Sequence, residues 1–387
     1  IRRPPRSTLD NLRRQRQMCI RDSVLVEWLS DVIGADLAPS WVAGHTLLLR
    51  EGYVWIGVSA RSDGVMNLKA RNPDRYGSLN HPGNSFSYDI LSQVSEAIRS
   101  PSGVDILGGL NAQHIIAIGQ ALPSRYMVTY LNAVHPLYNS YDGYLLSRRN
   151  ANGMPLSLPP QESVETPDVT KIRTDLNVPV MTVQSETEMF LRDFLAVRQE
   201  DTEKFRLWEV AGTSHIDLYS SIGGLSDDGT DPSFAVVKEE DPLGCELPIN
   251  QGPFPWVFNA AINALAMWVR DDIGPPGAEY LAVSDDNSQF LYDEFGNVLG
   301  GVRTPYVDAP AAVLSGEGQS GPGLCFLTGT TMLFDGAFMA SKYTDKAGYI
   351  QAVSNAANDE VARGFLLASD AERIKAAASL QWDMLGI

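Results

Sequence analysis

The chain has 387 residues, of which 44% are hydrophobic and 20% are charged, and its formal net charge is −17. The composition is ordinary for a globular protein, and the length suits one large α/β domain or two smaller ones. The acidic balance argues against a nucleic-acid partner, which would need a basic face. The sequence has no apolar run long enough to span a bilayer, and no repeat of ~20–50 residues indicates a solenoid or propeller.

Residues 1–23 differ in character from the rest of the chain. They contain seven arginines against Asp10 and Asp22, show no hydrophobic periodicity, and stop where a strand-like run begins at Val24. The strings IRRPPRSTL and QRQMCIRDS resemble translated sequencing adapter. We predict that this segment is non-native or disordered and that the native N-terminus, with any signal peptide, is missing. A basic nucleic-acid-binding arm is the alternative. Without the segment the net charge is −22.

Short apolar runs alternate with helical stretches from residue 24 to about residue 220. Continuous apolar runs are typical of strands buried on both faces of a parallel sheet, and alternation with helices indicates βαβ units. The predicted strands are 24–28, 53–59, 114–118, 143–147, 178–184 and 205–210. Residues 41–50 and 88–98 are predicted helices between them. The fold class is therefore α/β, with a mostly parallel, doubly wound sheet.

Two later regions are less regular. Residues 149–176 are rich in Pro, Ser, Asn and Gly and form either a cap-like insertion over the strand ends or a simple surface insertion. From about residue 220 we predict an extension of helices and loops. It contains a helix at 254–270, whose apolar stripe we assign to the core, and a last helical region at 361–380. We expect residues 24–387 to form one domain.

The cysteines indicate at most one disulfide. Cys19 lies in the unusual N-terminal segment, whereas Cys245 and Cys325 lie in loop-like sequence beside Gly and Pro. We expect these two to pair, which would imply an oxidising compartment such as the periplasm or the exterior. Two buried free thiols are the alternative. The sequence has no C-x-x-C or His-x-x-x-His spacing, so we predict no metal and no cofactor.

The run from His114 to Ser124 predicts a buried strand, a sharp turn and a helix. This is the arrangement of a nucleophile elbow, in which a serine stands at the turn between small residues. Gly119 meets the size requirement, but Ala121 stands at the serine position. The N–H of Leu122 would be one oxyanion donor, because it follows the nucleophile position. Ser124 is the nearest hydroxyl and the alternative nucleophile, although it lies one helical turn further on.

An acid and a histidine follow in the order that a catalytic triad needs. Ser185-Glu186-Thr187-Glu188 comes directly after the strand at 178–184, and we prefer Glu188 as the acid, with Glu186 in reserve. His215 follows the strand at 205–210 through a Gly-containing loop, where histidines are often functional. In such a site the acid orients the imidazole, and the imidazole takes the serine proton.

These segments together resemble a family of α/β-hydrolase-domain proteins found mainly in bacteria and environmental assemblies. The likeness covers nearly everything from residue 24 onward. The motifs that carry it are VEWL at 26–29, WIGVSA at 55–60, DRYG at 74–77, HPG at 81–83, YDI at 88–90, TYLNAVHP at 129–136, WEVAGTSH at 208–215 and GGVRTP at 300–305.

The resemblance adds expectations and marks two departures. The family's elbow is similar to G-E-S-Q-S-A, so this chain departs at the serine itself, and its acid stretch is similar to S-E-T-D, with Glu188 replacing Asp. The resemblance implies an α/β-hydrolase fold, strands preceding Val24 that are absent here, and a second oxyanion donor from the backbone at Leu29 and Ser30. It also implies esterase-like activity with no defined substrate.

The sequence therefore predicts the scaffold of a carboxylic-ester hydrolase that is impaired because Ala121 replaces the serine. A non-catalytic small-molecule-binding protein of the same fold is the alternative hypothesis, and an error in the source DNA at this codon is a third. The expected partner is a small-molecule ester, with no nucleic acid and no membrane. The sequence does not indicate an oligomeric state.

Overall fold

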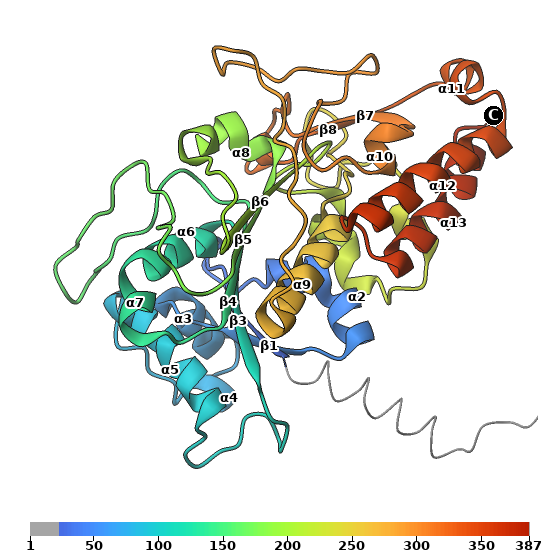
Figure 1. Ribbon diagram of the computed structural model, residues 1–387. Coiled ribbons are helices and arrows are strands. Elements are labelled where there is room, and N and C mark those ends of the chain that lie inside the picture. The colour runs from blue at the N-terminus through green and yellow to red at the C-terminus, as the bar shows by residue number, and fades with distance from the viewer. Residues whose placement is uncertain (1–22, 387) are drawn as a thin grey trace, which may run out of the picture.

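The computed structural model describes residues 23–386 and is built around a six-stranded sheet with helices on both faces (Figure 1). All neighbouring strands are parallel, in the order β2-β1-β3-β4-β5-β6. The structure confirms the α/β fold class and all six predicted strands. The strands are β1 (Ser23–Trp28), β2 (Val54–Val58), β3 (His114–Gln120), β4 (Gly143–Ser147), β5 (Val180–Ser185) and β6 (Phe205–Val210). Strand β1 already includes Ser23, and the rest of the segment predicted as non-native lies outside the described residues.

The sheet separates two hydrophobic cores. Successive side chains of β1 alternate between them, so that Val24 and Val26 belong to one core and Leu25 belongs to the other. This alternation follows from the period of two in an extended strand. Because both faces are buried, the strands need apolar residues at nearly every position, which is why they are recognisable in the sequence.

Helices cover the two faces separately. Helices α2 (Pro39–Glu51) and α9 (Phe254–Asp271) pack together on one face, and both contact β3. The other face carries α3 (Ser62–Arg71), α4 (Pro73–Tyr76), α5 (Ser87–Arg99), α6 (Leu122–Thr129) and α7 (His135–Tyr138), shown in blue to teal in Figure 1. A π-helical turn at Tyr130–Val134 joins α6 to α7. Across residues 23–386, none of the helices combines the length and hydropathy needed to cross a bilayer.

The sheet order places a crevice at the carboxyl ends of β1 and β3. The chain leaves β1 toward β2 on one side and returns to β3 on the other side, so the direction of the crossovers reverses between these neighbours. In open α/β sheets, ligands bind outside the carboxyl ends of the strands at such a switch point. The loops after β1, β3, β5 and β6 meet at this edge.

A buried carboxyl group anchors the first helix to the sheet. Glu27 in β1 accepts hydrogen bonds from the N–H groups of Ser40 and Trp41 in the first turn of α2, at 2.7 and 3.0 Å. The indole of Trp55 donates a third hydrogen bond, at 2.9 Å. These contacts satisfy N–H groups that a helix start leaves unpaired. Burial raises the pKa of Glu27 to about 7, although the three hydrogen bonds act in the opposite direction.

The segment 149–176 runs over the α5–α6 side of the molecule. Tyr88 of α5 and Thr129 of α6 donate hydrogen bonds to the carbonyls of Pro155 and Met154, at 2.9 and 2.6 Å. Asn132 in the π-helical turn donates to the carbonyl of Lys171 at 2.8 Å. The segment contains no regular helix or strand, only an isolated bridge between Ser157 and Val164. Its backbone polar groups are therefore satisfied partly by the surrounding helices and partly within the segment, as in the hydrogen bond from Thr170 N–H to the carbonyl of Ala151 at 2.9 Å.

The C-terminal part differs from the prediction of one last helical region at 361–380. Helices α12 (Lys346–Arg363) and α13 (Ala368–Met384) occupy this region. Helix α12 ends because Gly364 adopts a left-handed conformation with φ of 88°. A short antiparallel pair, β7 (Ala312–Ser315) and β8 (Thr330–Leu333), was not predicted. The remaining α-helices are α8 (Glu186–Leu191), α10 (Pro305–Asp308) and α11 (Gly336–Tyr343).

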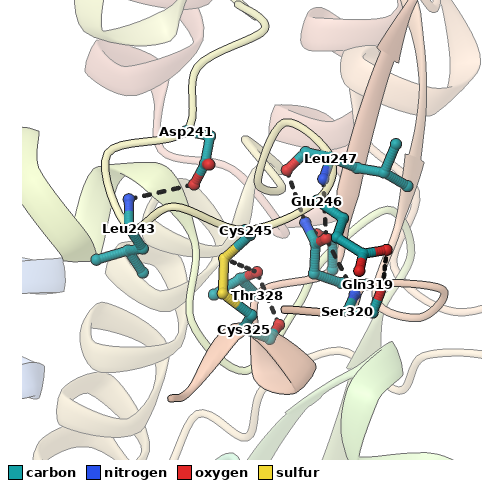
Figure 2. The surroundings of a disulfide bond; sticks show 10 residues. Asp241, Leu243, Cys245, Glu246, Leu247, Gln319, Ser320, Cys325 and Thr328 are labelled. Atoms are coloured by element: carbon teal, nitrogen blue, oxygen red, sulfur yellow. Dashed lines mark hydrogen bonds between the residues drawn. A yellow bond between two sulfur atoms is a disulfide. The ribbon is translucent and has the colours of Figure 1, made fainter. Parts of the chain in front are cut away.

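Cys245 and Cys325 form the predicted disulfide (Figure 2). The surrounding loops are joined further by hydrogen bonds: Glu246 N–H donates to the carbonyl of Ser320 at 3.0 Å, and Leu247 N–H donates to the side chain of Gln319 at 3.1 Å. The disulfide therefore links the loop after β6 to the segment between β7 and β8. Residues 324–327 of that segment reach the carboxyl edge of the main sheet.

We predict that the stability of the fold decreases as Glu27 loses its proton. The folded state keeps this proton up to about pH 7, whereas the unfolded chain releases it near 4.5. The free energy of unfolding should therefore fall between these pH values. Glu27→Gln should flatten this fall, measured by chemical denaturation at several pH values. Glu96→Gln, on the exposed surface of α5, is the control. An unchanged slope in Glu27→Gln would contradict the assignment.

We predict that the disulfide stabilises the fold by constraining the unfolded chain. It joins residues separated by 80 positions, and a disulfide typically stabilises a protein by about 2–4 kcal/mol. The double substitution Cys245→Ser/Cys325→Ser should lower the free energy of unfolding by this amount in denaturant titrations. A reductant should destabilise the wild-type protein equally and leave the double variant unaffected. Equal stability of the two proteins would refute this role.

Candidate active site

The turn between β3 and α6 is made by Ala121 alone. Its backbone has φ 59° and ψ −119°, a region that residues with a side chain rarely adopt. Ala121 N–H donates to the carbonyl of Ser147 in β4 at 2.9 Å, which ties the turn to the neighbouring strand. The backbone thus has the sharp strand-to-helix geometry expected of a nucleophile elbow.

The sequence around Ala121 makes this turn sterically possible. A Cβ atom on Gly119 would lie 2.8 Å from the sulfur of Met127 and 3.0 Å from the carbonyl carbon of Pro123, so only glycine fits there. Ser124 is fully buried, and its hydroxyl donates to the carbonyl of Ala121 at 2.5 Å. That hydroxyl stabilises the first helical turn and is directed away from a role as substitute nucleophile.

Glu188 and His215 lie in direct contact at the ends of β5 and β6. His215 Nδ1 is 2.5 Å from Glu188 Oε1, and the N–H and hydroxyl of Ser185 donate to Glu188 Oε2 at 2.8 and 2.6 Å. Burial alone would raise the pKa of Glu188, but the contact with His215 and the Ser185 hydrogen bonds together hold this pKa below its ordinary value. Glu188 is therefore a charged acceptor, and His215 Nε2 is the ring nitrogen left to take a proton.

Glu186 has a different position from Glu188. Its two carboxyl oxygens accept hydrogen bonds from Gly212 N–H at 2.6 Å and Gly316 N–H at 2.7 Å. It therefore links the loop that carries His215 to the end of β7. Burial raises the pKa of Glu186 to about 8 despite these two hydrogen bonds. The structure thus brings His215 together with Glu188 and not with Glu186.

A buried ion pair lies next to these residues. Arg148, which follows β4, pairs with Asp217 two residues after His215, and both side chains are almost fully buried. The guanidinium also lies 3.5 Å above the ring of Phe254 in α9. Its positive charge is one of the influences that lower the pKa of Glu188. His215 N–H donates to the hydroxyl of Thr187 at 3.0 Å, which fixes the loop from the other side.

Ala121 and His215 line the same cavity, which has a volume of about 200 Å³. Its polar lining comes from Ser30, Asn150, Arg125 and Arg192. Asn150 is the lining residue that the segment 149–176 supplies. The apolar lining consists of Val32, Leu122, Ile216, Leu324, Phe326 and Leu327. A lining that is mostly apolar, with a few convergent polar groups, suits a small organic ligand.

The backbone donors expected for an oxyanion differ in their availability. Leu122 N–H has no acceptor among residues 23–386 and stands directly after Ala121, as predicted. Leu29 N–H, however, donates to the carbonyl of Val58 at 3.1 Å, and Ser30 N–H donates to the carbonyl of Leu37 at 2.9 Å. Neither is free in this conformation. The adjacent Asp31 N–H has no acceptor within the described part of the chain and stands between two cavity-lining residues.

The sequence prediction missed several cavity residues. Arg125 and Arg192 stand four residues after Ala121 and four after Glu188 (in α6 and at the end of α8), so the i, i+4 periodicity of a helix could have identified them. Residues 324–327 gave no comparable signal, because the disulfide brings them to the site from far along the chain. No group of three His, Cys, Asp or Glu side chains in residues 23–386 has an arrangement that could hold a metal ion.

We predict that Ala121→Gly stabilises the protein. A strained backbone at a residue with a side chain costs ~1–3 kcal/mol, whereas glycine adopts this conformation readily and loses ~0.5–1 kcal/mol through its flexibility. The free energy of unfolding should therefore rise by about 1 kcal/mol in denaturant titrations. Ala117→Gly, within β3, is the matched control and should destabilise. A loss of stability in Ala121→Gly as large as in the control would contradict the strain.

Comparison with known families agrees with this architecture. The sequence model described as "Alpha/beta hydrolase domain" matches residues 18–376, which is nearly the whole chain. A comparison with curated proteins returns no match. The match spans the parallel sheet, the turn at Ala121 and the loops that carry Glu188 and His215. The chain belongs to the alpha/beta hydrolase domain family.

Proposed function

We propose that this protein is a carboxylic-ester hydrolase scaffold of the Ser–His–acid type, in which Ala121 occupies the nucleophile position. The observation that carries the proposal is the backbone of Ala121, which is strained at a residue that faces the same cavity as His215. Strain of this kind persists at functional sites because the surrounding structure enforces it. The chain as sequenced lacks the hydroxyl and is therefore impaired.

The roles of the remaining groups follow from their positions. With serine at position 121, its oxygen would attack the ester carbonyl while His215 Nε2 takes the proton. Glu188, bonded to Nδ1, would orient the ring and stabilise its charged form. The oxyanion would lie near the N–H of Leu122, with Asp31 N–H as the second donor. His215 would then return the proton to the departing alcohol, and water would release the acyl group.

The electrostatics of the two glutamates favour Glu188 as the acid. The pKa of Glu188 is lowered beside His215, so this group is ionised where a charged partner for the imidazolium is needed. The pKa of Glu186 is raised to about 8 by burial, and its oxygens are occupied by Gly212 and Gly316. Glu186 is therefore assigned a structural role, joining two loops of the site.

A non-catalytic binding protein is the second candidate, and Ala121 itself is the observation that favours it. The cavity, the His215–Glu188 contact and the elbow geometry are all retained without a nucleophile. Such a protein would bind an ester or a related small molecule without turning it over. The two candidates therefore differ in what a serine at position 121 does.

We predict that Ala121→Ser gains esterase activity. Loss of a triad nucleophile removes a factor of roughly 10⁶ in kcat in a well-studied protease, so the serine variant should exceed its parent by roughly 10³-fold or more. The measurement is the hydrolysis of a short-chain 4-nitrophenyl ester. Adding Glu188→Gln to Ala121→Ser should remove most of this gain.

The matched substitution Glu186→Gln separates catalysis from structure. In the Ala121→Ser background it should lower the thermal stability, because an amide cannot accept from both N–H donors, while leaving more activity than Glu188→Gln. An Ala121→Ser variant that binds esters but remains as inactive as the wild type would favour the binding protein. Equal activity losses from the two glutamate substitutions would contradict the assignment of the acid.

A further inference from the structure

Two guanidinium groups in the cavity have no hydrogen-bond or ion-pair partner in residues 23–386, although that of Arg192 lies 6.0 Å from the centre of the Phe326 ring. Arg125 and Arg192 both line it, and neither side chain makes a hydrogen bond or an ion pair there. The Nε atom of each is buried and unsatisfied. Their charges also oppose each other, since burial first and then the neighbouring Arg192 lower the pKa of Arg125. Two adjacent cations held in this way are unfavourable unless an anion joins them.

Three other arginines whose side chains are buried or largely buried pair with carboxylates, whereas the fully buried Arg149 donates to the carbonyl of Thr170 at 3.1 Å. Arg148 pairs with Asp217, Arg198 pairs with Glu209, and Arg373 pairs with Asp227. The chain has 47 acidic residues against 30 basic ones, so carboxylates are abundant. No carboxylate lines the cavity, and the third polar group beside the arginines, Asn150, can also donate hydrogen bonds. The cavity is thus rich in donors within an acidic protein.

We propose that Arg125 and Arg192 bind an oxyanion group, a carboxylate or a phosphate, carried by the ester that occupies this cavity. The planar guanidinium offers parallel N–H donors that match either oxyanion. The apolar wall formed by Leu324, Phe326 and Leu327 would contact the hydrocarbon part of the ligand. This proposal rests on the proposed function for the position of the ester bond and adds the charge of the substrate.

Binding to the natural Ala121 chain tests the proposal without any turnover. The probes are phenyl hydrogen glutarate, its neutral methyl ester, and a phenyl ester that carries a phosphate monoester, each titrated by calorimetry. We expect at least one anionic probe to bind about tenfold or more tightly than the neutral one, because hydrogen bonds to charged groups are strong. The tighter anionic probe identifies the oxyanion. Equal binding of all three overturns the proposal.

Substitution assigns the preference to these residues. Arg125→Gln/Arg192→Gln should abolish the preference for the anionic probe, and it breaks no hydrogen bond or ion pair within residues 23–386. Arg125→Lys/Arg192→Lys should keep part of it. Arg173 pairs with Asp175 and does not line the cavity. Arg173→Gln removes one positive charge there, so this variant should keep the full preference for the anionic probe. A preference that survives in the double glutamine variant overturns the proposal.

The Ala121→Ser variant separates this inference from the proposed function. This variant should hydrolyse 4-nitrophenyl hydrogen glutarate faster than the neutral ester. If adding Arg125→Gln/Arg192→Gln removes this difference in rate, the proposed function and the oxyanion site are both supported. Hydrolysis of both esters with a ratio that the arginines do not affect overturns the inference alone. Anion-selective binding without hydrolysis of either ester overturns the proposed hydrolase and supports the oxyanion site.

Discussion

The organisation of this protein depends on one constraint, the reversal of the chain direction at Ala121 between a strand and a helix. Because one residue makes the turn, Gly119 must lack a side chain and the Ser124 hydroxyl must hold the carbonyl of Ala121. The hydrogen bond from Ala121 to Ser147 transmits the position of the turn to the sheet. The parallel arrangement of the sheet then brings the loops after β5 and β6 to the same edge, where His215 meets the cavity.

Two glutamates two positions apart show how environment divides the roles of identical side chains. Glu188 contacts His215 and two donors of Ser185, and its pKa falls, whereas Glu186 receives two backbone N–H groups and its pKa rises to about 8. Both are fully buried, so desolvation acts on both, and the difference comes from their partners. An ionisable neighbour is what makes one of them suitable for proton chemistry.

The fold could be predicted largely from sequence, because a strand buried on both faces is apolar throughout and a parallel sheet gathers its carboxyl ends at one edge. The same logic located Ala121, Glu188 and His215. Apart from the pairing of Cys245 with Cys325, the local sequence indicated no long-range contact in the C-terminal part, so the cavity wall at residues 324–327 and the β7–β8 pair were missed. The N–H groups of Leu29 and Ser30, predicted as oxyanion donors, bond in this structure to the carbonyls of Val58 and Leu37. The break between α12 and α13 depended on Gly364, whose φ of 88° ends a helix that periodicity alone would continue.

The conformation of Ala121 also has a consequence at the level of the codon. The backbone is unfavourable for any residue with a side chain, so the surrounding architecture enforces it and not the alanine itself. Serine codons of the UCN type and alanine codons differ in their first base only, so a single nucleotide separates this chain from one with a hydroxyl at the turn. Such a change would need no second substitution to hold the backbone, because alanine and serine share the Cβ atom that makes this conformation unfavourable.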